Sequence, residues 1–509
     1  MTAWPISNET SKVFPLYSRA NVGEIFPDPI TPLNASLGFQ HTLEPGWRDA
    51  FIACGGVWDD DLYDDSVDFN ILPAFGSYLY INMSLMRLFG VRVPGMGAEA
   101  VDLQYFGDMP GIPSYESEKR DFDQSPPEYE AKAGAWLAEQ VLGATDLAAY
   151  DADRDEVDEI RRNRPDMSTL SDAELVERMK SFETLLRRLF KHHIEASLKS
   201  GVGLGAIAQL AEAVGKPEQS LTLVAGLGNV DSAGPPSLRM WDLSRRAQHP
   251  DVAALFDAGT KGLYAKLRAS ESAAVAEFTA ELDTFLADWD FRGPPAEWEI
   301  RAITWGGVDP DLALATIDRM RDVSDDEAPE AKSAERAAQR DAAAAAIREI
   351  LAADAEASAQ FEAVLNASAL WMRGRERGRT TAAMLIHELR LPALELGRRF
   401  ADKGAIDTSR QIFMVFADEL PDFLVNPESY RETLVEREKV YLELFDRTPP
   451  FVVDGTPPPI SEWPLRSESS VATASSGDTI TGVPACGGVA RGRARVLTNP
   501  DDPLGPRAG

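Results

Sequence analysis

Cysteine is almost missing from this chain, which has two cysteines, Cys54 and Cys486, among 509 residues. The two lie far apart and form neither the framework of a disulfide-rich domain nor the spacing of a metal site. Proteins of the reducing cytosol carry few or no disulfides. We therefore expect two free thiols and a cytoplasmic protein.

Long apolar runs and excess positive charge are missing too. No stretch approaches the roughly 20 apolar residues that span a bilayer, and the first residues show no secretory signal. The 82 acidic residues outnumber 51 basic ones, for a net charge of −31. Such a surface repels nucleic acid and anionic membranes, so we expect neither as a partner. Any phosphate-handling site must gather its arginines locally.

Several ligand-binding motifs are also lacking. There is no P-loop, no Rossmann glycine fingerprint and no repeat of 20–50 residues. The acidic run within 59–68 lacks the Gly and Glu positions of a calcium loop, so a solvated acidic face is expected and no metal site is predicted. The glycines of 201–205 follow no strand, which favours close helix packing over a phosphate cradle.

The segments that are present predict a mainly α protein. Residues 1–130 are rich in Pro, Gly and aromatics and include a strand-like run at 76–82, which indicates a small mixed α/β portion. Residues 131–453 show helical patterns, with a capping box at Ser171–Glu174, an alanine-rich stretch at 331–372 and a helix start at Asn426. They predict a large helical substrate-binding domain of eight or more helices.

The C-terminal part changes character. Residues 454–478 are rich in Pro, then in Ser and Ala, and are predicted to be a linker. Residues 479–509 show glycine turns and then alternation, which is typical of strands. About thirty residues cannot bury a core of their own, so they are expected to begin an incomplete domain.

Four segments in this order resemble the phosphoenolpyruvate-utilising phosphotransferases, in particular the branch with rifampicin phosphotransferase and phenylphosphate synthase. They are YSRANVGEIFPDPITPL at 17–33, DFRGPPAEWE at 290–299, RERGR at 375–379 with its continuation to 420, and GVPACGGVARGRARV at 482–496. Two positions depart from the family pattern. Phe291 stands where the family has histidine, and Arg379 stands where it has lysine.

The resemblance implies a phosphotransferase built of three parts. An ATP-grasp domain uses ATP and Mg²⁺ to phosphorylate a histidine on a swivelling domain, which delivers the phosphoryl group to an organic hydroxyl on the helical domain. Residues 479–509 resemble the first strands of the swivelling domain, and its histidine is expected beyond residue 509. No ATP-grasp segment is recognised. We therefore expect ATP and Mg²⁺ to be bound by a partner domain or subunit, as in two-subunit phenol- and cresol-phosphorylating enzymes.

Arg375 and Arg379 are the leading catalytic candidates. Four residues apart on a helix, they share a face, and two guanidinium groups held together attract an anion. Phosphoryl transfer depends on positioning and charge stabilisation, which arginines supply. Glu376, between them, is a candidate substrate-binding residue. The alternative is a solvated basic face with Glu376 and Glu388 as ion-pair partners.

His387 and Trp371 flank this arginine pair. His387 is a candidate general base for the acceptor hydroxyl, since its ordinary pKa is near neutrality; the alternative is a satisfied core or surface histidine. Trp371, one turn before Arg375, is a candidate apolar wall for an aromatic acceptor, or else a core residue. The other histidines, which include His192 and His193 in a predicted helix, lack the sequence context of a phosphocarrier.

The remaining candidates come from the other two matching segments. Arg292 and Glu297 are predicted to form either an ion pair that fixes their loop or part of the pocket wall. Arg19, Asn21 and Glu24 lie in a proline-rich segment and are predicted to line the pocket mouth, or to form a plain turn.

These observations predict a component that binds a phenol-like acceptor and presents its hydroxyl to a phosphohistidine. A second hypothesis keeps the machinery and makes the acceptor a rifamycin-type antibiotic. A third is a non-catalytic helical scaffold. A narrow aromatic pocket would favour the phenol, and a wide pocket lined by Met and Leu the antibiotic. Arginines directed to solvent would favour the scaffold.

Overall fold

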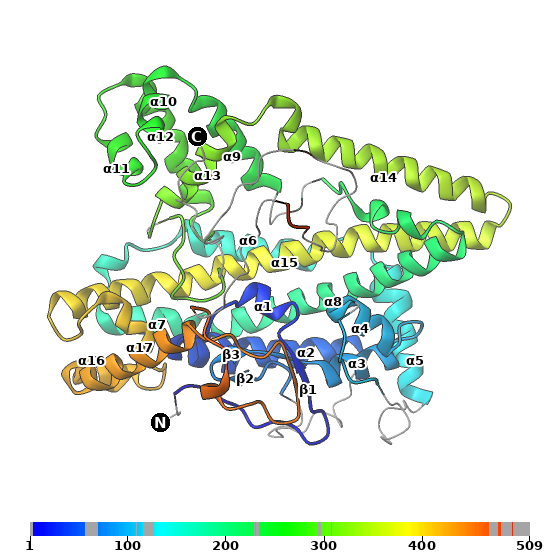
Figure 1. Ribbon diagram of the computed structural model, residues 1–509, viewed down its shortest axis with the longest axis horizontal. Helices are drawn as coiled ribbons and strands as arrows, with labels where there is room; N and C mark the ends of the chain where they lie inside the picture. Colours follow the sequence, from blue (N-terminus) through cyan, green and yellow to red (C-terminus); the bar gives the residue numbers. More distant parts are fainter. Residues whose placement is uncertain are drawn as a thin grey trace.

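The computed structural model describes residues 4–55, 70–107, 109–115, 127–228, 230, 234–293, 297–306, 308–467, 477–479 and 491. The protein is mainly helical and has two small antiparallel sheets, as predicted (Figure 1). None of the helices described is both long and apolar enough to cross a bilayer.

Two long helices form the axis of the molecule. α15 (Ala355–Asp402) runs through its middle, and α8 (Glu183–Ala213) lies beside it (Figure 1). Small residues let them approach closely. A Cβ added at Gly203 would come within 2.8 Å of the Ser368 hydroxyl, and one at Gly378 within 3.0 Å of the His193 Cα. The prediction that glycines of 201–205 serve helix packing is confirmed at Gly203.

The N-terminal portion packs below this axis in Figure 1. β1 (Leu16–Ser18) lies between β4 (Ile81–Asn82) and β5 (Val452–Asp454), antiparallel to both. β2 (Ala74–Phe75) pairs with β3 (Tyr78–Leu79), so the strand-like run at 76–82 is confirmed as parts of two strands. The helical elements of this portion are α1 (Val22–Ile25), the π-helical segment Asn34–Leu43, α2 (Glu44–Cys54), α3 (Met83–Arg92) and α4 (Ala98–Phe106).

The chain after β5 stays on the N-terminal portion as far as residue 467. Trp463 is buried and packs edge-on against Tyr78, with ring centroids 5.8 Å apart. Arg466 reaches Asp28 at 3.0 Å. The first half of the predicted linker is therefore packed here, and the domain boundaries stay predictions. Residues 480–490 and 492–509, where the start of the swivelling domain is predicted, lie outside the described residues.

A lobe with its own core stands above α15 in Figure 1. Its helices are α9 (Gly234–Arg246), α10 (Pro250–Asp257), α11 (Leu263–Arg268), α12 (Ala273–Asp288) and α13 (Asp311–Arg321). Phe256, Phe278 and Phe285 are central to this core, which is separate from the large core around α8 and α15. The alanine-rich stretch forms α14 (Pro329–Leu351) and the start of α15, with Asp354 capping the second helix.

The other helices complete the body. They are α5 (Pro127–Ala135), α6 (Ala148–Arg162), α7 (Asp172–Ser181), α16 (Leu420–Val425) and α17 (Arg431–Phe445). The capping box of Ser171 and Glu174 is confirmed at the start of α7. The predicted helix start at Asn426 is confirmed in position: Asn426 precedes a 3₁₀ turn, Pro427–Tyr430, which continues directly into α17 at Arg431. The predicted cap is not formed, because the Asn426 side chain makes no capping hydrogen bond.

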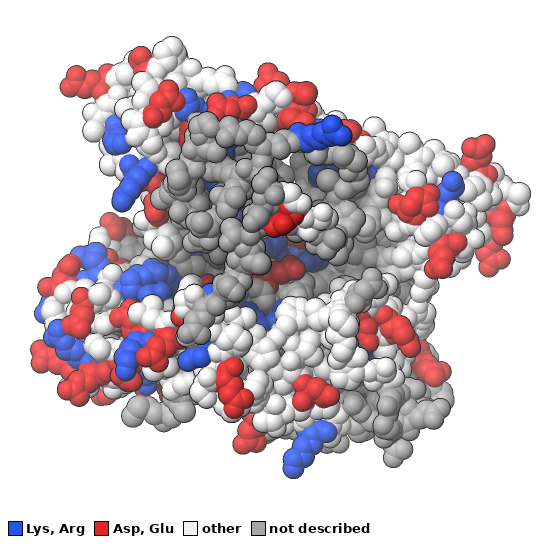
Figure 2. Space-filling view, in the orientation of Figure 1, with Lys and Arg blue, Asp and Glu red and all other residues white. Residues whose placement is uncertain are grey.

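Charged side chains of both signs are scattered over the described parts of the face drawn in Figure 2. Basic side chains gather at the end that carries α16 and α17, among acidic ones. The C-terminal end of α15 carries ion pairs; Arg398 reaches Glu395 at 2.7 Å, and Arg399 reaches Asp172 at 2.8 Å. Although the net charge is strongly negative, the charged side chains on this face are therefore of both signs.

Candidate functional site

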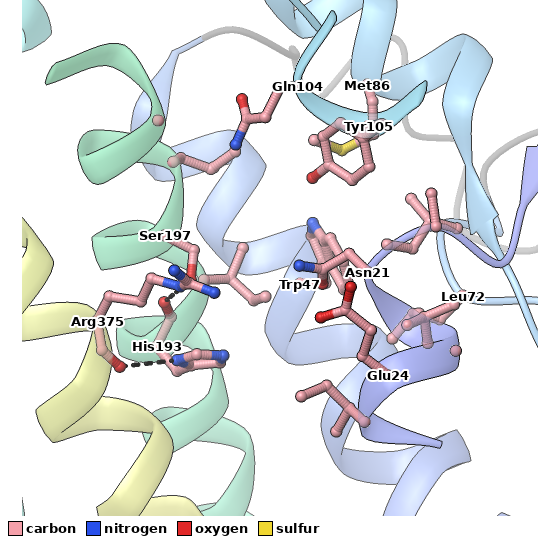
Figure 3. Close-up of a pocket in the computed structure, with 18 of the residues that line it drawn as sticks. Asn21, Glu24, Trp47, Leu72, Met86, Gln104, Tyr105, His193, Ser197 and Arg375 are labelled. Atoms are coloured by element: carbon pink, nitrogen blue, oxygen red, sulfur yellow. Dashed lines mark hydrogen bonds between the residues drawn. The ribbon is translucent and has the colours of Figure 1, made fainter. Parts of the chain in front are cut away.

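A cavity of about 880 Å³ lies between the N-terminal portion and the two long helices. The segment around α1, together with α2, α3 and α4, walls it on one side, and α8 and α15 wall it on the other (Figure 3). Its apolar lining includes Leu43, Trp47, Leu72, Met86, Phe89, Met96, Phe190 and Trp298. Its polar lining includes Arg19, Asn21, Glu24, Gln104, Tyr105, His193, Ser197, Arg375 and Arg379.

Arg375 and Arg379 make one end of the cavity positive. Both project from α15 and line the cavity, as their spacing on one helical face predicts. The Arg375 side chain is 39% exposed, and the buried Nε of Arg379 has no hydrogen-bond partner among the described residues. This end of the cavity therefore retains donors that an anion can engage.

His193 borders the arginine end from α8. Its Nδ1 lies 3.3 Å from the backbone oxygen of Arg375, and its ring packs against Phe190 and Trp298 with centroids 5.9 and 5.6 Å apart. Burial, with the positive charges of Arg375 and Arg379, lowers the pKa of His193 to about 3. The imidazole is therefore neutral at neutral pH.

The segment before and within α1 forms the opposite side of the cavity. The Arg19 guanidinium donates to the backbone oxygens of Leu79 at 2.9 Å and Phe26 at 2.7 Å, so it also fixes this segment. Asn21 has φ 65°, which is unusual for a residue other than glycine. The Asn21 and Glu24 side chains face Arg375 and Ser197 across the cavity (Figure 3).

Five predicted site residues therefore meet in one cavity, namely Arg19, Asn21, Glu24, Arg375 and Arg379. Two segments far apart in the sequence supply them. The arrangement juxtaposes paired guanidinium groups with a largely apolar space, which suits an organic molecule next to an anionic group.

Two predicted residues lie elsewhere, and their assignments need correction. Trp371 is buried and its Nε1 donates to the Val141 backbone oxygen at 3.0 Å, so it is a core residue rather than a cavity wall. His387 is fully buried outside the cavity lining, with Asp290 3.4 Å from Nε2 and Arg390 2.9 Å from Nδ1. A general base must reach the substrate, and His387 does not reach this cavity.

Arg292 and Glu297, in the loop before α13, also lie outside the lining, although Trp298 of the same loop contributes to it. The Arg292 Nε lies 3.0 Å from the Glu297 carboxylate, in the predicted alternative of a structural ion pair. Burial lowers the pKa of Arg292, the Glu297 carboxylate opposes this shift, and the positive charge of Arg379 adds to it. The ion pair therefore lies near the arginine end of the cavity. Glu376 is 17% exposed and likewise lies outside the lining.

Sequence reasoning missed several lining residues. His193, Ser197 and Gly201 recur every four residues on α8, so they form a polar and small stripe on a mostly buried helix. That stripe is a usable signal for a cavity-facing helix. No comparable signal marks Tyr105 or Trp47, because large aromatic residues are equally common in cores.

Residues 192–376 match the family model described as rifampicin phosphotransferase fourth domain. The matched segment runs from α8 to α15 and contains both His193 and Arg375. The chain thus has a domain shared with rifampicin phosphotransferase and is related to the phosphoenolpyruvate-utilising phosphotransferases.

Three curated relatives are uncharacterized proteins, one from Mycobacterium bovis and two from strains of Mycobacterium tuberculosis. Each is 34% identical to this chain over 126 residues, which cover 25% of this chain and 14% of the relative. The chain therefore corresponds to a small part of their length. Within the described residues, no group of three or more His, Cys, Asp or Glu side chains is placed to hold a metal ion.

Proposed function

We propose that this chain is the acceptor-binding component of a phosphotransferase, and that its cavity presents an organic hydroxyl to an incoming phosphoryl group. The observation that carries the proposal is the convergence of Arg375 and Arg379 on one end of a largely apolar cavity. Arginine pairs stabilise the charge of a transferring phosphoryl group, and apolar walls bind the organic acceptor.

The supply of the phosphoryl group is part of the same proposal. ATP and Mg²⁺ are used by an ATP-grasp domain or subunit, and a phosphohistidine carries the group to the cavity. The relationship of residues 192–376 to rifampicin phosphotransferase supports this arrangement. We further propose that the protein works in the cytoplasm and has neither nucleic acid nor a membrane as a partner.

The size of the cavity bears on the acceptor. A volume of about 880 Å³ is near the upper end of the range of pockets that hold drug-sized ligands, and a single phenol ring would leave most of it empty. The walls combine Trp47, Phe89 and Trp298 with Met86 and Met96. We therefore propose a phenol-like acceptor of several rings.

A rifamycin-type antibiotic is the second candidate. The volume of the cavity and the leucine and methionine side chains in its lining, among them Leu72, Leu198 and Leu204, favour it. A scaffold without catalytic function is disfavoured because both arginines line the cavity.

The test combines the full chain with an ATP-grasp partner, Mg-ATP, and separate panels of phenols, naphthols and rifamycins. Phosphate esters are followed by mass spectrometry. Arg375→Ala and Arg379→Ala should each lower the rate by about 10²–10³, because each removes charge stabilisation of the transferring group. Arg377→Ala is the matched control: Arg377 lies between them on α15 but pairs with Asp151, outside the cavity lining.

The outcomes separate the hypotheses. Naphthyl or phenyl phosphates would support the aromatic acceptor, and rifamycin phosphate alone would support the antibiotic. Rates unchanged in both arginine variants would contradict the proposed site. If no phosphate ester forms in any panel while the partner is active, the non-catalytic scaffold is the hypothesis that remains.

A further inference from the structure

We infer that His193 binds the acceptor hydroxyl through Nε2 and takes its proton as the phosphoryl group is transferred. This inference rests on the proposed function and names the base that the reaction needs. The predicted base, His387, is buried away from the cavity, so another residue has to serve as the general base. His193 lines the cavity beside both arginines.

The hydrogen bond of Nδ1 sets the tautomer of His193. A backbone carbonyl oxygen only accepts, so Nδ1, 3.3 Å from the Arg375 oxygen, must carry the hydrogen. In the neutral ring Nε2 then holds the lone pair. Among the described residues, no hydrogen bond to Nε2 is found. A ligand hydroxyl is the kind of donor that can satisfy it.

The ring is held in place from several sides. Phe190 and Trp298 pack against it, and Gly378 of α15 lies directly against the His193 backbone. In Figure 3 His193 stands below Ser197 on α8, with its ring beside the space that separates α8 from Asn21 and Glu24. A rigid imidazole at this place positions a hydroxyl between the apolar walls and the arginine end.

The charges around His193 tie its basicity to the presence of the phosphoryl group. The charged and titratable groups lining the cavity around it are Arg375 and Arg379 on α15, Glu24 on α1, Arg19 before α1 and Tyr105 on α4. Burial and the two α15 arginines hold the pKa of His193 far below its ordinary value. An anionic phosphoryl group against those arginines offsets their charge and raises the pKa of His193. The base therefore strengthens when the phosphoryl group is in place.

The transfer balances as one displacement. The acceptor oxygen forms a bond to phosphorus while the bond from phosphorus to the donor nitrogen of the proposed phosphohistidine breaks, and that nitrogen keeps the electron pair. The acceptor proton moves to Nε2 of His193. The resulting imidazolium is stabilised by the new phosphate ester and afterwards returns its proton to solvent.

A binding experiment tests the contact without any transfer. Calorimetry compares 2-naphthol with 2-methoxynaphthalene, which has the same rings but no hydroxyl hydrogen. The wild-type chain should bind 2-naphthol about three- to tenfold more tightly, the usual worth of one hydrogen bond. His193→Asn should abolish this preference, because asparagine can keep the donor to the Arg375 oxygen and lacks the Nε2 position. An unchanged preference would overturn the contact.

A kinetic experiment tests the proton transfer. With 2-naphthol, His193→Asn should lower the rate about 10²–10⁴-fold, the usual contribution of a general base. With a nitronaphthol that is already ionised at the assay pH, the deficit should largely disappear, because no proton remains to be removed. A deficit of the same size for both acceptors would show a structural role and overturn the inference.

Two further variants keep the test decisive. His192→Asn is the matched control on the same helix, because His192 faces Asp153 at 2.5 Å and lies outside the cavity lining. His193→Gln repeats the experiment if His193→Asn does not fold, since its amide is also unable to take a proton. If the wild-type chain forms no ester, the proposed function and the base role fail together, and the comparison with the methyl ether still decides whether His193 binds a hydroxyl.

Discussion

Arg375, Arg379 and His193 form a group of three side chains in which each affects the others. The two guanidinium groups hold the pKa of His193 down, and the backbone of Arg375 orients its ring. A neutral imidazole next to two cations accepts hydrogen bonds and leaves the positive charge to an anion. This division of roles is what a site for a hydroxyl beside a phosphoryl group requires.

His193 should also make the protein sensitive to acid. Its pKa is about 3 in the folded state and near 6.5 when unfolded, so below pH 6.5 the unfolded chain binds more protons. The stability that it contributes is present above pH 6.5 and is lost as the pH falls toward 3. Each pH unit in this window costs up to about 1.4 kcal/mol for one proton.

Urea unfolding at pH 7, 5.5 and 4.5 measures this effect. Other carboxylates also lose their partners in acid, so the comparison is between the wild-type chain and His193→Asn. The variant should lose less unfolding free energy over the same range. The difference between the two proteins should correspond to the uptake of one proton, which is up to about 1.4 kcal/mol per pH unit. Equal losses in both proteins would contradict a buried neutral His193.

At the scale of elements, the packing of α15 is set by its glycines. A Cβ at Gly397 would stand 2.1 Å from the Ser409 backbone oxygen, and one at Gly378 would stand 3.0 Å from the His193 Cα. Gly397→Ala should cost about 1–3 kcal/mol of unfolding free energy, because the backbone has to move, and should leave acceptor binding intact. Gly378→Ala should weaken acceptor binding, because it displaces His193.

Thermal unfolding and calorimetric binding of 2-naphthol to both variants check this prediction. The two substitutions add the same methyl group to the same helix, so each controls for the other. Binding lost in Gly397→Ala and kept in Gly378→Ala would reverse the expected order and argue against the placement of His193.

A largely buried ion-pair network joins the end of α6 and the residues after it to the segment that follows α12 and to α15. Asp290 lies 2.9 Å from Arg161, 2.7 Å from Arg164 and 3.4 Å from His387. These groups hold the pKa of Asp290 well below its ordinary range in spite of burial. Asp290→Ala should cost about 3–5 kcal/mol, because it leaves buried positive charge without its partner.

This prediction assigns His387 to stability rather than to catalysis. Denaturant unfolding of Asp290→Ala gives the cost, and calorimetry with 2-naphthol gives the effect on the cavity. Affinity should stay close to that of the wild-type chain wherever the variant is folded. A stable variant with lost affinity would restore His387 and its partners as candidates for the site.

For the whole molecule, the lobe of α9 to α13 has a core distinct from the core around α8 and α15. Separate cores open independently when few contacts join them. Amide hydrogen exchange should therefore show the lobe opening at a lower free energy than residues of α8. Bound acceptor should slow exchange in α8 and α4, which line the cavity, and leave the lobe unchanged.

Mass-spectrometric exchange on peptides of α12 and α8, with and without 2-naphthol, measures both effects. Equal opening free energies would show one cooperative unit. Protection by the acceptor confined to the lobe would contradict the position of the cavity.

The sequence by itself determined the features that depend on local spacing. Helical periodicity and propensity predict the mainly α fold, the capping box at Ser171 is visible in four residues, and the spacing of Arg375 and Arg379 places both on one face. Such features arise from neighbours within one or two turns, so no distant partner is needed to predict them.

Only the tertiary structure decided which residues share the cavity. Periodicity predicts on which face of a helix a residue lies, but it does not predict which element packs against that face. Trp371, one turn from Arg375, faces Val141 in the core, and His387 meets Asp290. His193, in a different helix, was brought beside Arg375 because glycines let α8 and α15 approach closely. The close packing of two helices far apart in sequence therefore decided which histidine can serve the site.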